Sequence, residues 1–221
     1  MSFIFHSTEQ DGVLFYFHKC GTTNITTPMP DRSVYNLIGS SVYTMKGQTA
    51  YEHYNQRFVN FDQKKYVLVR HPMEKFISGY HHYLALIESN LDNKKDWMSK
   101  LLNRKFRVYD INLHCEAVRK LSVLNETYED DYGHHCLDFY LHCVEDMGDH
   151  ITNDMEVIRL GGNYETLRNT SLYELLEGKH SNQTQAHIKK STFLNWTPES
   201  YNYITKKYKK TMKRLGYKYD H

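Results

Sequence analysis

Three short runs constrain the fold of this 221-residue chain most strongly, and the first two consist mainly of apolar β-branched and aromatic residues. They span residues 13–18, 66–70 and 155–160; glycines flank the first run, and two glycines end the third. Runs of this length and composition are typical of buried strands. Long helical patterns separate them, and parallel strands require such long connections. We therefore predict an α/β fold: a P-loop-like central parallel sheet flanked by helices.

Most helical patterns follow the second run. Pro72 suits the first turn of a helix, and a stripe of apolar residues follows it at helical spacing: Met73, Phe76, Ile77, Tyr80, Leu84 and Ile87. The other expected helical segments are 94–103, 112–124, 136–147, 171–177, one from Thr197–Pro198 to Leu215 closed by Gly216, and short pieces around 33–38 and 49–58. Because no internal repeat or low-complexity linker interrupts the chain, we predict one domain over residues 1–221.

The net charge and the N-terminal residues indicate which classes of function are less favoured. Lys and Arg number 28 against 26 Asp and Glu, so the net charge of +2 argues against a surface for bulk nucleic acid. The N-terminus lacks a basic start followed by a long apolar core, and no run approaches a membrane span. We expect a soluble protein in the cytoplasm of a cell or of an infected host. The basic stretch 206–214 is interpreted as the solvated face of a helix, with contact to an anionic ligand as the alternative.

A first candidate site follows the first apolar run. There Lys19, Cys20 and Gly21 precede two threonines. A glycine lets the backbone turn so that successive N–H groups point at an anion, and Lys19, Thr22 and Thr23 add donors. In the common nucleotide loop the lysine follows the glycines, whereas here it precedes them. An ordinary strand-to-helix turn with a surface lysine is the alternative interpretation.

A second candidate site follows the second run. Arg70 ends that run, and Ser78 lies two turns into the next helix. Open α/β sheets bind ligands outside the carboxyl ends of their strands, so Arg70 is expected to face the same crevice as Lys19. A guanidinium fork and a hydroxyl suit a second phosphate. Glu74, Ser78 and His81 are expected opposite the apolar stripe. Arg70 could also be a salt-bridged residue before a helix, but two anion sites after two parallel strands support each other.

Both stretches resemble motifs of one enzyme family. HKCGTTNI (18–25) resembles the 5′-phosphosulfate loop of sulfotransferases that use 3′-phosphoadenosine 5′-phosphosulfate (PAPS), written as a proline followed by K-[TC]-[GA]-[ST]-T-S. RHPMEKFISGY (70–80) resembles their 3′-phosphate motif, R-[DH]-P-x-x-[RK]-x-x-S-x-Y. The similarity is greatest to the carbohydrate (Golgi-type) branch, which includes heparan and uronyl 2-O-sulfotransferases. Weaker similarities follow at 161–167, 186–192 and 215–219.

The resemblance implies a role for each matching residue. Lys19 would contact the phosphosulfate and stabilise the charge that grows on the leaving phosphate oxygen. The resemblance assigns the 5′ side of the donor to the backbone N–H groups of Cys20, Gly21, Thr22, Thr23 and Asn24. Arg70 and Ser78 would hold the 3′-phosphate, and Lys189 or Lys190 would close over it. A sulfuryl group carries less charge than a phosphoryl group, so no metal is expected.

The acceptor hydroxyl, expected on a sugar or glycan, needs a general base. His53 is our choice, because an imidazole titrates near neutrality and the 2-O-type relatives use a histidine in this interval. Glu52, His18 and His81 are the alternatives. His18 stands where the family has a proline, so the shape of the loop can differ. The identity of the acceptor cannot be transferred from the family.

Other functions and sites remain alternatives. A nucleotide kinase or another phosphate-loop enzyme is one, although the G-K-[ST] order is missing. A non-catalytic nucleotide-binding relative is another. The pairs His135–Cys136 and His142–Cys143 suggest a metal on one helix, but zinc sites favour shorter spacings. We therefore expect two buried cysteines with exposed histidines, and no metal.

Overall fold

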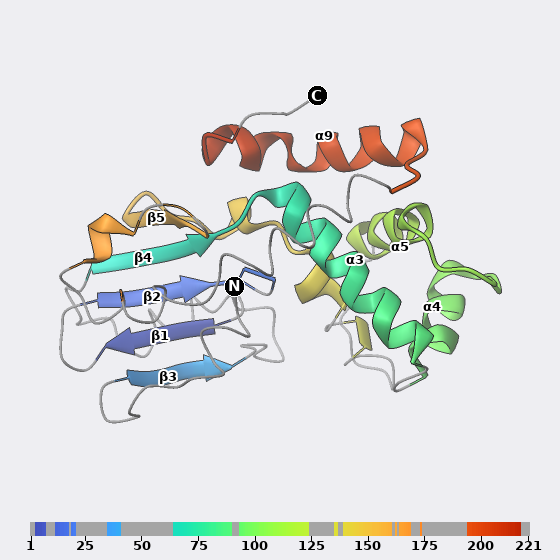
Figure 1. Cartoon of the computed structure of the whole chain (residues 1–221), viewed down its shortest axis with the longest axis horizontal. Coiled ribbons are helices and arrows are strands. Elements are labelled where there is room, and N and C mark those ends of the chain that lie inside the picture. The colour runs from blue at the N-terminus through green and yellow to red at the C-terminus, as the bar shows by residue number, and fades with distance from the viewer. Residues whose placement is uncertain are drawn as a thin grey trace. The chain divides into compact units, whose positions relative to one another are not determined.

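The computed structural model of this chain describes two compact units (Figure 1). The described residues are 3–7, 12–17, 19–20, 35–40, 64–89, 93–123, 135–136, 139–160, 162, 164–168, 173 and 194–217. The sheet unit comprises residues 1–71 and 147–186, and the helical unit comprises residues 72–146 and 187–221. The single sulfotransferase-like domain over residues 1–221 stays a prediction.

One five-stranded sheet forms the sheet unit, in the order β3-β1-β2-β4-β5 (Figure 1). Its strands are β1 (Phe3–Ser7), β2 (Gly12–Tyr16), β3 (Tyr35–Ser40), β4 (Lys64–Val69) and β5 (Met155–Arg159). Strands β2, β4 and β5 pair in parallel, whereas β1 is antiparallel to both β2 and β3. The fold is therefore mixed α/β with a three-stranded parallel part, and all three predicted strands are confirmed.

The N-terminal part of the sheet differs from the prediction. We expected a short helix around 33–38, and this is wrong, because Tyr35–Ser40 is strand β3. Strand β1 was not expected. A helix of six residues is marginal alone, whereas every residue of β3 except Ile38, at a shift in register, has a cross-strand partner on β1. The second short helical piece, 49–58, lies outside the described residues.

Strands β2 and β4 are buried on both faces. Leu14, Phe15, Tyr16 and Phe17 alternate in direction along β2 and its end, yet all four are fully buried. One face joins a cluster of buried residues: Leu14, Tyr16, Tyr66, Leu68, Ile158 and Leu167. Burial on both sides explains why these strands are continuous apolar runs rather than alternating ones.

Helices dominate the helical unit, which contains α3 (Pro72–Glu88), α4 (Lys94–Leu102), α5 (Ile111–Val123) and α9 (Pro198–Arg214). All four are confirmed predictions. The predicted caps of α9 are present too: the Thr197 hydroxyl accepts a hydrogen bond from the Ser200 backbone N–H (3.2 Å), and Gly216 closes the helix with φ 67°. No helix among the described residues is long and apolar enough to cross a membrane. Of the predicted helix 171–177, the structure describes Tyr173 alone.

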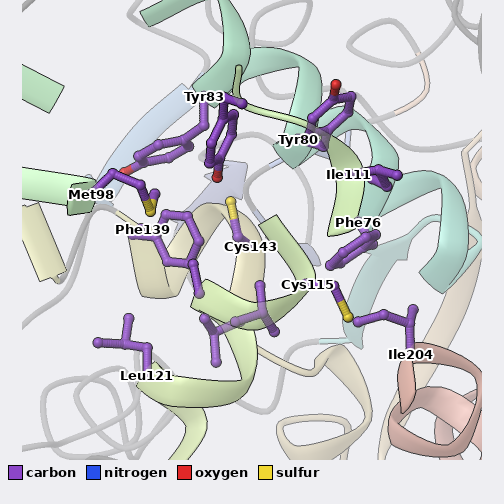
Figure 2. Packing of buried hydrophobic residues seen from close by; sticks show 14 of the residues in the cluster. Phe76, Tyr80, Tyr83, Met98, Ile111, Cys115, Leu121, Phe139, Cys143 and Ile204 are labelled. Carbon is purple, nitrogen blue, oxygen red and sulfur yellow. The ribbon is translucent and has the colours of Figure 1, made fainter. Parts of the chain in front are cut away.

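The buried face of α3 is centred one position away from the predicted stripe. Phe76, Tyr80 and Ile87 are buried, but Gly79 and Tyr83 are buried with them, while Met73, Ile77 and Leu84 are half-buried. Figure 2 shows Tyr83 grouped with Met98, Phe139 and Cys143. At Gly79 an added Cβ would lie 2.9 Å from the His142 carbonyl oxygen and 3.0 Å from the Cys143 Sγ, so the glycine permits close packing.

The predicted helix over 136–147 is wrong as one regular element. A π-helix (η2) spans Tyr140–Val144, and a 3-10 turn (η3) spans Met147–Asp149. The cysteine expectation holds in part, because Cys143 is buried whereas Cys136 is half-buried. His142 is half-buried and stacks on His82, with ring centroids 4.8 Å apart. A π-helix adds a residue to a turn, which shifts the faces that a regular helix would present.

A buried histidine lies at the centre of the helical unit. His114 is 0% exposed, and its Nδ1 is 2.7 Å from the Tyr109 hydroxyl. Four aromatic rings surround it, with centroids 5.0 to 5.9 Å away: Phe76, Phe139, Tyr80 and Tyr109. Burial in this apolar surrounding, with a smaller contribution from the nearby His81, lowers the pKa of His114 to about 3.

Candidate anion-binding site

Strand β2 leads into a tight turn at Phe17–Cys20. The Cys20 backbone N–H donates to the Phe17 carbonyl (3.1 Å), and Lys19 has a φ of 64°. A positive φ at the third position is what several tight turns need, and glycine or asparagine normally supplies it. A lysine in this conformation costs about 1 kcal/mol. Backbone strain of this kind clusters at ligand sites, and this turn carries the predicted donor-binding lysine.

Arg70 holds this turn from the neighbouring strand. Tyr16 of β2 lies opposite Leu68 of β4, so the two parallel strands end at the same edge of the sheet. Arg70 directly follows β4, and its Nη1 donates to the Lys19 carbonyl oxygen at 3.2 Å. Arg70 is only 8% exposed, whereas Lys19 is half-buried. The Arg70 guanidinium and the backbone of Lys19 therefore lie side by side at the carboxyl edge of the sheet, as the parallel pairing predicts.

A contact between two sulfur atoms stabilises the Phe17–Cys20 turn. The Cys20 thiol donates to the Met147 Sδ at 3.5 Å, and both side chains are buried. Phe17, the first residue of the turn, also packs on the His150 ring with centroids 6.0 Å apart. Met147 and His150 belong to the segment that leads into β5, so this segment supports the turn from its buried side. Sequence reasoning did not find this support, because 127 residues separate Cys20 from Met147.

The second half of the RHPMEKFISGY motif lies on α3. Ser78 is half-buried there, and the predicted neighbours Glu74 and His81 are half-buried too. None of them is in the core, as expected for the face opposite the buried stripe. The His81 ring lies beside Tyr80, with centroids 5.1 Å apart.

Lys75 of the same motif is 1% exposed, and sequence reasoning gave it no position in the core. Its Nζ donates to the Glu145 carbonyl oxygen at 3.0 Å. Tyr208 and Thr211 of α9 hold the same segment, through the Cys143 carbonyl (3.4 Å) and the Asp146 carboxylate (2.6 Å). Residues 143–146 are thus held from two helices just before the chain reaches Met147. The burial of Lys75 could have been suspected only from its helical spacing, which places it on the same face of α3 as Pro72 and Gly79.

Several predicted site residues lie outside the described part of the chain: Gly21, Thr22, Thr23, Asn24, His53, Lys189, Lys190, and the alternative bases His18 and Glu52. The structure thus brings together Lys19, Cys20 and Arg70 of the predicted donor site. Ser78 belongs to the helical unit. Within the described ranges, no three His, Cys, Asp or Glu side chains form a group that could hold a metal ion.

Comparison of the chain with protein-family models, with curated proteins and with solved structures gives no match. The described residues define a mixed α/β protein in which Arg70 holds the backbone of the Lys19 turn at the carboxyl edge of two parallel strands.

Proposed function

We propose that this protein is a PAPS-dependent sulfotransferase that transfers the sulfuryl group to a hydroxyl of an acceptor, most favourably a carbohydrate. The observation that carries the proposal is the contact between Arg70 and the Lys19 turn. It joins the two stretches that resemble the phosphosulfate and 3′-phosphate motifs, at the edge where open α/β sheets bind ligands. A donor with phosphates at both ends suits two neighbouring cations.

The reaction would proceed by direct displacement at sulfur. The acceptor hydroxyl oxygen attacks the sulfur, and an O–S bond forms while the bond from sulfur to the bridging phosphate oxygen breaks. The proton of the hydroxyl passes to the base, for which His53 is our choice. The products are a sulfate ester and adenosine 3′,5′-bisphosphate. Lys19 would act where negative charge grows, on the bridging oxygen that leaves.

Arg70 would have two tasks in this scheme. The hydrogen bond from Nη1 holds the carbonyl of Lys19, which fixes the strained turn. A guanidinium has five N–H donors in a planar fork, so Arg70 could hold the turn and contact a phosphate at the same time. Ser78, Lys189 and Lys190 would add donors for the 3′-phosphate.

Calorimetry with adenosine 3′,5′-bisphosphate and with ADP tests the choice of ligand. We expect tighter binding of the bisphosphate without Mg²⁺, and a loss of this binding in Lys19→Ala. Lys64→Ala is the matched control, because Lys64 is an exposed lysine at the opposite, amino end of β4. Transfer of ³⁵S from labelled PAPS to a panel of glycans and small hydroxylated metabolites then tests the reaction.

The outcomes separate the alternatives. A preference for ADP, or turnover that needs Mg²⁺, would favour a nucleotide kinase or another phosphate-loop enzyme and overturn the proposal. Tight binding of the bisphosphate without transfer to any acceptor would favour a non-catalytic binder. Near-normal turnover in His53→Ala would show that another residue is the base.

A further inference from the structure

The C-terminal half of α9 carries five basic residues on one face. We call this set the basic face: Lys206, Lys209, Lys210, Lys213 and Arg214, all exposed. Their spacing of three and four residues places them within roughly 140° of arc, over about 12 Å of helix. The opposite side of α9 is buried in the helical unit through Ile204, Tyr208, Thr211 and Met212. The fold therefore fixes the helix by its apolar side and presents its cations outward.

The four lysines of the basic face do not stabilise the described part of the fold through ion pairs. Cations three and four residues apart on a helix repel each other, and the helix dipole favours only those in the last turn, Lys213 and Arg214. Of the residues that the structure describes, none forms a hydrogen bond or an ion pair with the side-chain amines of Lys206, Lys209, Lys210 or Lys213. Five cations are thus held together at a cost to the helix, without a described acidic partner for the four lysines.

The basic residues around one cleft of the helical unit are arranged differently. Around a cleft of about 590 Å³ beside the first turn of α9, Arg119 pairs with Glu199 at 2.8 Å. Arg104 and Lys120 both pair with Glu116 in the same cleft. The cleft is electrically balanced, whereas the basic face is not. The whole chain has a net charge of only +2, so the positive charge of the basic face is a local feature and does not reflect a general excess of Lys and Arg.

A flat anionic surface fits the basic face best. Lysine side chains are long and flexible, so all five cations can reach a plane laid along the helix. Four to eight basic residues on an amphipathic helix are typical of binding to acidic phospholipids. Nucleic acid is less suited, because the basic face carries no aromatic side chain for base stacking and the chain is not strongly basic. We infer that the basic face docks the protein on membranes rich in anionic lipid. Because the apolar side of α9 is buried, this docking is electrostatic and does not insert the helix.

This inference stands apart from the proposed sulfotransferase activity, and vesicle cosedimentation tests it directly. The full chain is mixed at low salt with vesicles of phosphatidylcholine alone, and with vesicles that contain 30% phosphatidylserine. We expect binding to the second alone, weakened steeply by salt. The variant K206Q/K209Q/K210Q/K213Q should bind several hundred-fold more weakly, because each lysine contributes about a factor of five near such a surface.

A matched variant separates the basic face from net charge. K64Q/K95Q/K105Q/R107Q removes four exposed basic residues elsewhere, so it has the same net charge as the first variant. It should bind like the wild type, and neither variant should have a lower thermal unfolding midpoint than the wild type, because removing the repulsion on α9 does not destabilise the helix. Equal losses in both variants, or no binding of the wild type to the anionic vesicles, would overturn the inference. Tighter binding to duplex DNA than to the vesicles would overturn it in favour of nucleic acid.

Discussion

His114 makes the helical unit sensitive to acid, and the effect can be calculated. Its pKa is about 3 in the folded protein against an ordinary value of 6.5. Between these two values the unfolded chain binds a proton at this imidazole and the folded protein does not. The contribution of the neutral imidazole to the free energy of unfolding is therefore fully present above about pH 7, and it is lost as the pH falls from 6.5 towards 3.

The size of the loss follows from 1.36 kcal/mol for each difference of one in pKa. A pH of 5 lies 1.5 below the pKa of 6.5 that the imidazole has in the unfolded chain. At this pH, proton binding to the unfolded chain therefore lowers the free energy of unfolding by about 2 kcal/mol. Below pH 3 the loss reaches its limit of about 5 kcal/mol. Either value is a large part of the stability of an ordinary domain.

The double variant His114→Leu/Tyr109→Phe tests this reasoning. It removes the titrating ring and also the hydroxyl that the ring holds at 2.7 Å, so no buried polar partner is left behind. Urea unfolding at pH 7.5 and at pH 5.0 should show that the wild type loses about 2 kcal/mol more than the variant. Tyr109→Phe alone keeps the imidazole and should keep the wild-type dependence on pH. An equal loss in the wild type and the double variant would refute the buried, neutral state of His114.

Three further substitutions test the packing and the turn. Gly79→Ala should lower the free energy of unfolding by about 1–3 kcal/mol in urea, because its Cβ would meet the His142 carbonyl and the Cys143 Sγ; a gain, as helix propensity alone predicts, would contradict this packing. Lys19→Gly should be about 1 kcal/mol more stable than Lys19→Ala, because glycine adopts a φ of 64° without strain. Equal stabilities would mean that the turn relaxes. Arg70→Lys keeps the charge but not the planar fork of the guanidinium, so calorimetry should show about tenfold weaker binding of adenosine 3′,5′-bisphosphate. An affinity within about threefold of the wild type would contradict the role of Arg70 in holding the Lys19 turn.

The sequence was most informative where one segment alone decides the structure. Strands β2 and β4 could be predicted because burial on both faces makes them continuous apolar runs. The ends of α9 could be predicted because Thr197 and Gly216 cap it through their own chemistry. Strand β3 could not be predicted, because its pairing with β1 decides its structure and YNLIGS has no strong period of its own.

The same distinction holds for the candidate site. Lys19 and Arg70 could be placed together because parallel strands end at one edge of a sheet. The support from Met147 and the burial of Lys75 could not be predicted, since their partners lie 127 and 70 residues away along the chain. The π-helix at Tyr140–Val144 also lacks a local signal, although it determines which side chains Gly79 meets.

The interleaving of the two units along the chain has a consequence for how the protein is made. Each unit consists of two separate stretches, so neither is complete until the ribosome has passed through part of the other. Strand β4 acquires its neighbour β5 only after residues 72–146 have been synthesised, and α3 acquires α9 only after residues 89–197 have been synthesised. During that interval β4 has an open edge, which nascent chains must keep from pairing wrongly. A cut at any one position would also leave at least one unit incomplete, so neither unit can be isolated by a simple truncation.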